Sequence, residues 1–107
     1  MKTLKFENKL AELILSGKKD STWRLFDDKN LSVNDDLILF NSDILEEFAK
    51  AKIISINEKK LKDINEVDYD GHEKFENNDE MIKTYQRYYG DKVTGNSFVK
   101  IIKFKLI

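Results

Sequence analysis

The spacing of apolar residues changes twice near the start of the chain, and this change limits the possible fold more than any other feature. The segment "TLKFE" alternates apolar and polar residues, which is typical of a half-buried strand. From Asn8 the apolar residues follow helical spacing until Gly17, where a helix C-cap belongs. The segment "STWRLF" then alternates again. These patterns predict a strand, a short helix that ends at Gly17, and a second strand.

Four later segments and a second helix complete the predicted order. Residues 34–40 and 49–58 have the apolar content of core strands, whereas residues 57–75 are polar and form the main predicted loop, with one helical turn at "LKDI". Residues 96–107 predict a final strand whose alternation slips near Ile101 and Ile102, and we expect a bulge there.

The second predicted helix lies just before this final strand. Asn78 or Asp79 is its expected N-cap and Gly90 its expected end, and the tyrosines Tyr85 and Tyr89 lie on its apolar stripe. The complete order of elements indicates an α+β fold with an antiparallel or mixed sheet, and the short strands are compatible with a small barrel.

Composition narrows the functional classes. The chain has 107 residues, which predicts one domain over residues 1–107, and 40% of them are hydrophobic, enough for a folded core. The formal charge of −1 argues against general nucleic-acid binding, although a local basic patch is compatible with it. The absence of cysteine excludes thiolate catalysis and cysteine-ligated metals, and predicts a cytoplasmic location. No apolar run near the N-terminus is long enough for a membrane span, so we expect no membrane contact.

The segment "GKKDSTWR" is the strongest candidate for a functional site. Strand alternation places Thr22 and Arg24 on one face, next to the turn that carries Lys18 and Lys19. Donors that converge at such a turn can bind an anion or a carbonyl group. The alternative interpretation is structural: the lysines complement the helix dipole, Thr22 favours a strand, and Arg24 pairs with a surface carboxylate.

Three further residues have competing interpretations. His72 is the single histidine, and among carboxylates it is expected to be a solvated loop residue, so we predict no metal site. Trp23 is expected in the core, with stacking on a base as the alternative. Tyr88 is expected to face solvent or a ligand.

The motif residues carry a family resemblance. "ILSGKKDSTWR", followed by "VNDDLILF", resembles the ASCH domain family of the PUA-like superfamily, whose mark is G-x-K-x-x-T-x-R. In this chain the motif reads Gly17, Lys19, Thr22 and Arg24, and Asn34-Asp35 replaces the family's usual Gly-Asp turn. "GHEKFENNDEMIKTYQRYYG" and "FVKIIKFKLI" resemble the family's second half, so the resemblance covers nearly the whole chain.

The resemblance implies an α+β PUA-like small β-barrel with two main helices. Some small ASCH proteins are amidohydrolases that remove the acetyl group of N4-acetylcytidine with a lysine, a threonine and a glutamate. This implies catalytic roles for Lys19, Thr22 and Glu76, although Glu73 and Glu80 lie close in sequence.

The expected ligand is a modified nucleoside or RNA. We expect Lys18, Arg24, Trp23 and Tyr88 to bind it, with no metal and no cofactor, and we expect a monomer. The alternative function is an RNA-binding ASCH/PUA-like module without catalysis.

Overall fold

The computed structural model describes residues 1–107, in which five strands form one mixed sheet. In chain order the elements are β1 (Lys2–Phe6), α1 (Asn8–Leu15), β2 (Ser21–Leu25), β3 (Asp36–Asn41), β4 (Glu46–Lys60), two 3₁₀ turns (Leu61–Asp63 and Glu66–Tyr69), α2 (Asn78–Tyr89) and β5 (Phe98–Leu106). The strand order is β1-β3-β4-β5-β2. The β1–β3 pair is parallel, and the other pairs are antiparallel.

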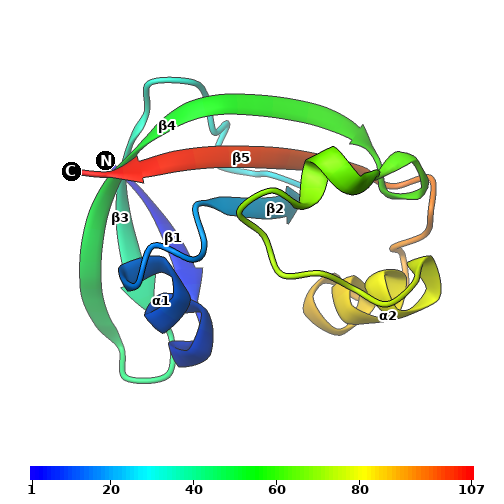
Figure 1. The fold of residues 1–107 in the computed structure, drawn as a ribbon, viewed down its shortest axis with the longest axis horizontal. Coiled ribbons are helices and arrows are strands. Elements are labelled where there is room, and N and C mark those ends of the chain that lie inside the picture. The colour runs from blue at the N-terminus through cyan, green and yellow to red at the C-terminus, as the bar shows by residue number, and fades with distance from the viewer.

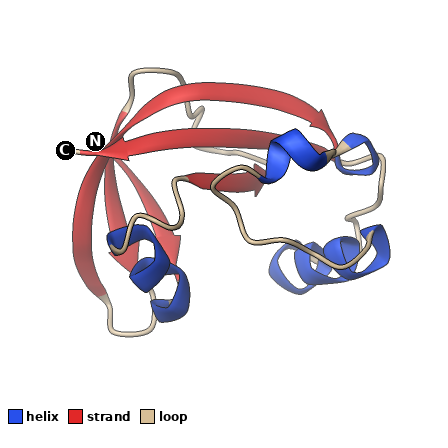
Figure 2. Ribbon diagram, viewed as in Figure 1, coloured by secondary structure: helices blue, strands red, loops and turns tan.

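The sheet is strongly curled. Figure 1 shows β4 and β5 arching across the molecule, with α1 and α2 below the two ends of the arch. Figure 2 shows that a long loop connects the 3₁₀ turns to α2 and crosses the space between the two helices. The structure confirms the predicted α+β PUA-like fold, in which the sheet forms a half-barrel between its edge strands β1 and β2.

Two apolar clusters cover the two faces of β5. Val99 and Ile101 belong to the cluster on the α2 side, whereas Ile102 and Phe104 belong to the cluster that includes β1 and β3. Because both faces are buried, consecutive apolar residues fit a regular strand. The predicted bulge near Ile101 and Ile102 is therefore wrong, and the register shift lies in β4, between Ile53 and Ser55.

The helix boundaries agree closely with the sequence pattern. Helix α1 is followed by Gly17 with φ of +82°, as predicted. Helix α2 begins one residue earlier than expected, because Asn77 is the N-cap and its side chain accepts the Glu80 N–H at 2.8 Å. The predicted loop over residues 57–75 is partly wrong, since β4 continues to Lys60 before the 3₁₀ turn at Leu61.

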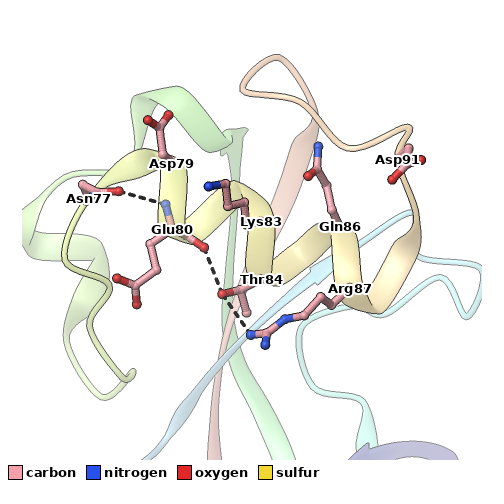
Figure 3. A pocket seen from close by; sticks show the side chains of 8 residues that line it. All are labelled: Asn77, Asp79, Glu80, Lys83, Thr84, Gln86, Arg87 and Asp91. Atoms are coloured by element: carbon pink, nitrogen blue, oxygen red, sulfur yellow. Dashed lines mark hydrogen bonds between the residues drawn. The ribbon is translucent and has the colours of Figure 1, made fainter.

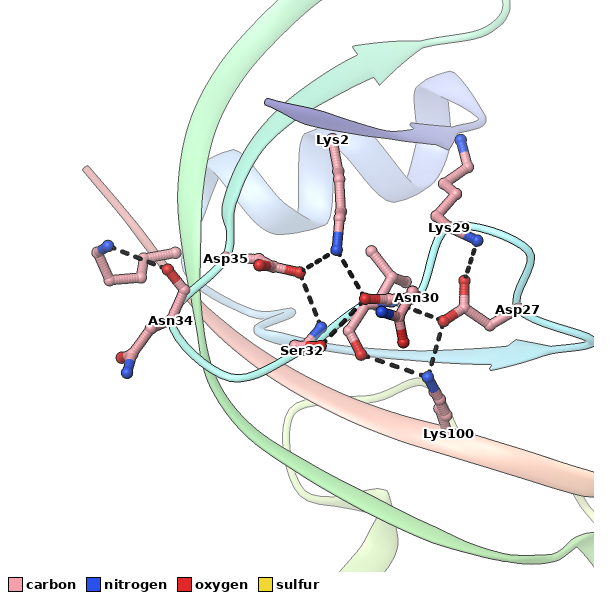
Figure 4. A network of polar contacts seen from close by, with 10 residues as sticks. Lys2, Asp27, Lys29, Asn30, Ser32, Asn34, Asp35 and Lys100 are labelled. Carbon is pink, nitrogen blue, oxygen red and sulfur yellow. Dashed lines mark hydrogen bonds and ion pairs between the residues drawn. The ribbon is translucent and has the colours of Figure 1, made fainter.

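A polar network holds the connection between β2 and β3 (Figure 4). Lys100 Nζ donates to Asp27 Oδ2 at 2.8 Å, and Lys2 Nζ donates to Asp35 Oδ2 at 2.7 Å. Asn34 has φ of +75°, which explains why asparagine can replace glycine at this turn. Neither helix combines the length and apolar character that crossing a membrane requires.

Candidate active site

The turn between α1 and β2 brings Lys19 into the protein interior. The backbone N–H groups of Lys18 and Lys19 both donate to the Leu13 carbonyl, at 3.0 and 3.1 Å, so the chain reverses tightly after the helix. The two lysines then differ completely in exposure: Lys19 is 3% exposed, whereas Lys18 lies at the surface. A buried lysine requires a partner or a lowered pKa.

Glu73 is the partner of Lys19. Lys19 Nζ lies 2.8 Å from Glu73 Oε2. Burial lowers the pKa of the Lys19 ammonium, and the attraction of Glu73 offsets this only in part. Burial by itself raises the pKa of Glu73, but Lys19 and His72 outweigh it and hold that pKa below its usual value. The pair therefore combines a lysine that releases its proton more readily than usual with a carboxylate that stays ionised.

Thr22 and Arg24 point to the same face of β2, as predicted. Arg24 Nε donates to Thr22 Oγ1 at 3.1 Å, and Arg24 Nη2 donates to the Lys5 carbonyl at 3.0 Å. The guanidinium also lies over the Phe6 ring, 4.8 Å from its centre. Since Arg24 occupies one lone pair of the Thr22 oxygen, the hydroxyl proton of Thr22 can be donated elsewhere.

His72 is buried, which corrects the prediction of a solvated loop residue. Its side chain is 3% exposed and its ring stacks on Trp23, with ring centres 4.0 Å apart and planes inclined by 13°. Burial, followed by the charge of Lys19, lowers the pKa of His72 to about 4. The imidazole is therefore neutral at physiological pH. No three His, Asp or Glu side chains converge in a group that can hold a metal ion.

A glycine connects this loop to β2. The Gly71 carbonyl accepts the backbone N–H groups of both Asp20 and Ser21 at 3.1 Å. These two bonds place the residues after Gly71 beside the start of the strand. His72 and Glu73 thereby reach Lys19 from a segment more than fifty residues away in sequence.

One cleft of about 710 Å³ is lined by Lys19, Thr22, Arg24, His72 and Glu73, among others. Its wall comes from β1, α1, β2, the turn after β3, the loop after Gly71 and α2. Its charged or hydroxyl-bearing members include Lys5, Glu7, Lys9, Lys19, Thr22, Arg24, Ser42, His72, Glu73, Lys74, Glu80, Thr84, Tyr85, Arg87, Tyr88 and Tyr89. Six of the residues in this wall are Lys or Arg and three are Glu. The cleft is thus more basic than the chain as a whole, whose formal charge is −1.

The predicted site residues separate into two groups. Lys19, Thr22, Arg24, Trp23 and Tyr88 all line the cleft. Trp23 does so as a buried residue, since His72 covers one face of its indole and Tyr85 stacks at 6.3 Å. Tyr88 is 55% exposed, and its hydroxyl donates to Glu7 Oε1 at 3.3 Å.

Glu76 and Lys18 do not contribute to the cleft wall. Glu76 is exposed and lies outside the set of lining residues, as does Lys18. The structure instead brings Glu73 to Lys19, so the expectation that Glu76 is the acidic partner needs correction. Glu73 makes the contact with Lys19 because Gly71 is hydrogen-bonded to the start of β2 only two residues before it.

Sequence reasoning also missed His72. The signal that was available is the Gly71-His72-Glu73 segment, in which a glycine with φ of +73° precedes two polar residues. A glycine with a required left-handed conformation often fixes a functional loop, whereas charge pattern alone does not distinguish among nearby glutamates.

A second hollow follows the exposed face of α2 (Figure 3). All eight residues in its wall are polar, and they include Asn77, Lys83, Gln86 and Asp91. Figure 3 shows Lys83 and Gln86 on the helix, with Asn77 at its N-cap and Asp91 just beyond its C-terminal end. The hollow contains no buried polar group comparable to Lys19, so the cleft is the better candidate site.

The fold of this chain is similar to that of several solved protein structures. No protein-family model and no curated protein matches this sequence. A solved structure from Enterococcus faecalis V583 has a TM-score of 0.78 at 14% identity, over 94% of this chain and 71% of its own. The ASCH domain of Lactobacillus crispatus has a TM-score of 0.73 at 14% identity, over 98% of this chain and 79% of its own.

A third structure agrees with these two. The ASCH protein of Zymomonas mobilis has a TM-score of 0.69 at 12% identity, over 96% of this chain and 65% of its own. The similarity covers nearly all of this chain in each case and includes both helices and the curled sheet. The chain therefore has the ASCH domain fold.

Proposed function

We propose that this protein is a nucleoside amidohydrolase that acts on N4-acetylcytidine or a related acylated cytidine. The observation that carries the proposal is the buried Lys19–Glu73 pair, 2.8 Å apart, in the same cleft as Thr22. A lysine is a useful base near neutral pH only when its pKa is lowered, and burial lowers the pKa of Lys19.

The three side chains support a two-step reaction. Neutral Lys19 removes the proton from Thr22 Oγ1, which attacks the acetyl carbonyl carbon. The resulting lysine ammonium returns the proton to the departing N4 nitrogen, which releases cytidine and leaves an acetyl ester on Thr22. Glu73 then takes a proton from water as the water attacks this ester. It passes this proton to Thr22 Oγ1 as the ester bond breaks, which releases acetic acid and restores the Thr22 hydroxyl and the Glu73 carboxylate. Arg24 holds the Thr22 oxygen in place through its 3.1 Å hydrogen bond.

The test is chromatographic conversion of N4-acetylcytidine to cytidine by the purified protein. We expect conversion by the wild type, and a loss of at least about 100-fold in kcat for Lys19→Met, Thr22→Val and Glu73→Gln, which keep side-chain volume. Lys105→Gln changes an exposed residue outside the cleft and serves as the matched control. No conversion by a folded wild-type protein would refute the proposed activity.

RNA binding without catalysis is the second candidate, because Lys and Arg outnumber Glu in the cleft wall. Exposed Lys5 and Lys9 have no carboxylate partner among the ion pairs of the chain, so they are available for phosphates. Affinity for single-stranded RNA that falls steeply with salt, without turnover of the nucleoside, would favour this function.

A further inference from the structure

The single hydrogen bond of the His72 ring determines which of its nitrogens carries the proton. Nδ1 lies 2.8 Å from the backbone carbonyl oxygen of Glu73. A carbonyl oxygen only accepts hydrogen bonds, so Nδ1 must be the donor. In a neutral imidazole the second nitrogen, Nε2, then has no proton and is an acceptor. The lowered pKa of His72 is consistent with this neutral form.

Nε2 has no hydrogen-bond partner within the protein. His72 lines the cleft, and the buried side-chain nitrogen and oxygen atoms that lack a partner are Ser21 Oγ and Trp23 Nε1, so Nε2 is not one of the sealed atoms. Lys19 Nζ donates to Glu73 Oε2 at 2.8 Å and makes no hydrogen bond to His72. Nε2 is thus a free acceptor that a molecule in the cleft can reach.

The orientation of this acceptor is fixed. Trp23, 2% exposed, stacks on one face of the imidazole, and Phe75 lies near it with ring centres 6.3 Å apart. The Nδ1 hydrogen bond prevents a ring flip, because the flipped ring would lose its bond to Glu73. A fixed acceptor discriminates between ligands that present an N–H and ligands that present an oxygen at the same point.

We propose that His72 is a specificity-determining residue whose Nε2 accepts a hydrogen bond from an N–H group of the ligand. This inference rests on the proposed function and deepens it: in a nucleoside, the 4-amino or 4-amide N–H of a cytosine ring would meet Nε2, whereas the 4-oxo group of uracil would place two acceptors against each other. The cleft would therefore select cytidine and its N4-acyl derivatives over uridine.

A measurement without ligand tests the acceptor directly. His72 is the single histidine of the chain, so protein labelled with ¹⁵N-histidine gives one pair of ring signals. We expect the protonated shift for Nδ1 and the unprotonated shift for Nε2 at pH 7. A proton on Nε2 would overturn the inference whether or not the protein binds nucleosides.

Adding nucleosides to the same sample tests the selectivity. We expect cytidine to move the Nε2 signal upfield and to bind about tenfold more tightly than uridine. His72→Phe keeps the stack on Trp23 but removes the acceptor, and we expect it to bind the two nucleosides within about twofold of each other. Lys105→Gln should retain the wild-type preference.

The outcomes separate the two proposals. Equal binding of cytidine and uridine by the wild type would overturn the role of His72 while leaving nucleoside binding in place. A His72→Phe variant that keeps the tenfold preference would also overturn it. Binding of neither nucleoside would refute the proposed function and the selectivity with it. The wild-type signals decide the question even if the variant fails to fold.

Discussion

We expect the stability of the protein to fall between pH 7 and pH 5 because of His72. The pKa of this residue is about 4 in the fold, against 6.5 for an ordinary histidine. The unfolded chain therefore binds more protons than the fold between these two values, and stability must rise with pH through this window. The stabilisation is complete above pH 6.5 and disappears as the pH falls toward 4.

The size of the effect follows from the two pKa values. The full difference between pKa values of 6.5 and about 4 corresponds to roughly 3 kcal/mol in the free energy of unfolding. Integration from pH 7 to pH 5 gives a loss of about 2 kcal/mol. Solvent screening reduces this free-energy change only slightly, because the imidazole is 3% exposed. The carboxylates whose pKa values are lowered, Glu73, Asp27 and Asp35, lose their contributions at lower pH and do not explain a change above pH 5.

Urea unfolding at pH 5, 6 and 7 measures this change, with wild type and His72→Phe compared at each pH. Wild type should lose about 2 kcal/mol between pH 7 and pH 5, and the variant should lose less than about 0.5 kcal/mol. The same dependence on pH in both proteins would show that a group other than His72 is responsible.

Two further predictions concern the site. Glu73→Gln should lower the unfolding free energy by about 1–2 kcal/mol, because Lys19 loses its charged partner. Exposed Glu76→Gln should change it by less than about 0.5 kcal/mol. Equal effects of the two substitutions in urea unfolding would contradict the contact between Glu73 and Lys19. Arg24→Lys retains the charge but loses the planar donors to Thr22 and Lys5, so we expect the free energy of unfolding to fall by about 1–3 kcal/mol. A near-neutral change in thermal unfolding would show that these hydrogen bonds contribute little to stability.

Local patterns predicted most of the fold because they depend on neighbouring residues. Strand alternation placed Thr22 and Arg24 on one face, and their 3.1 Å hydrogen bond agrees with it. The slip in alternation near Ile101 does not indicate a bulge, because alternation identifies a single buried face and β5 is buried on both faces by different clusters. Only the three-dimensional arrangement of α2 and β1 reveals the second cluster.

The site was harder to predict because half of it arrives from a distant loop. The helix-to-strand motif indicated Lys19 and Thr22, but the choice among Glu73, Glu76 and Glu80 depends on the direction in which an irregular segment points. Periodicity gives no information about such a segment. His72 was misjudged for the same reason, since its burial depends on the indole of Trp23, which lies on another element.

Gly71 links this loop to the strand, and its replacement tests whether the loop position controls the site. Gly71 has φ of +73°, and an alanine Cβ there would lie 1.8 Å from Asp20 Oδ1. Gly17 has φ of +82° but nothing within 4 Å of an added Cβ, so Gly17→Ala carries the backbone strain alone. Each substitution should cost about 1–2 kcal/mol from strain, measured by urea unfolding.

The two variants should differ at the cleft. Gly71→Ala must also move Asp20, and that movement disturbs the two hydrogen bonds that the Gly71 carbonyl accepts at 3.1 Å. Glu73 and His72 follow Gly71 directly, so their contacts with Lys19 and Trp23 should loosen in this variant and remain in Gly17→Ala. The ¹⁵N signals of His72 report the difference: they should change in Gly71→Ala alone. Identical spectra for the two variants would show that the position of the loop after Gly71 does not depend on its bond to β2.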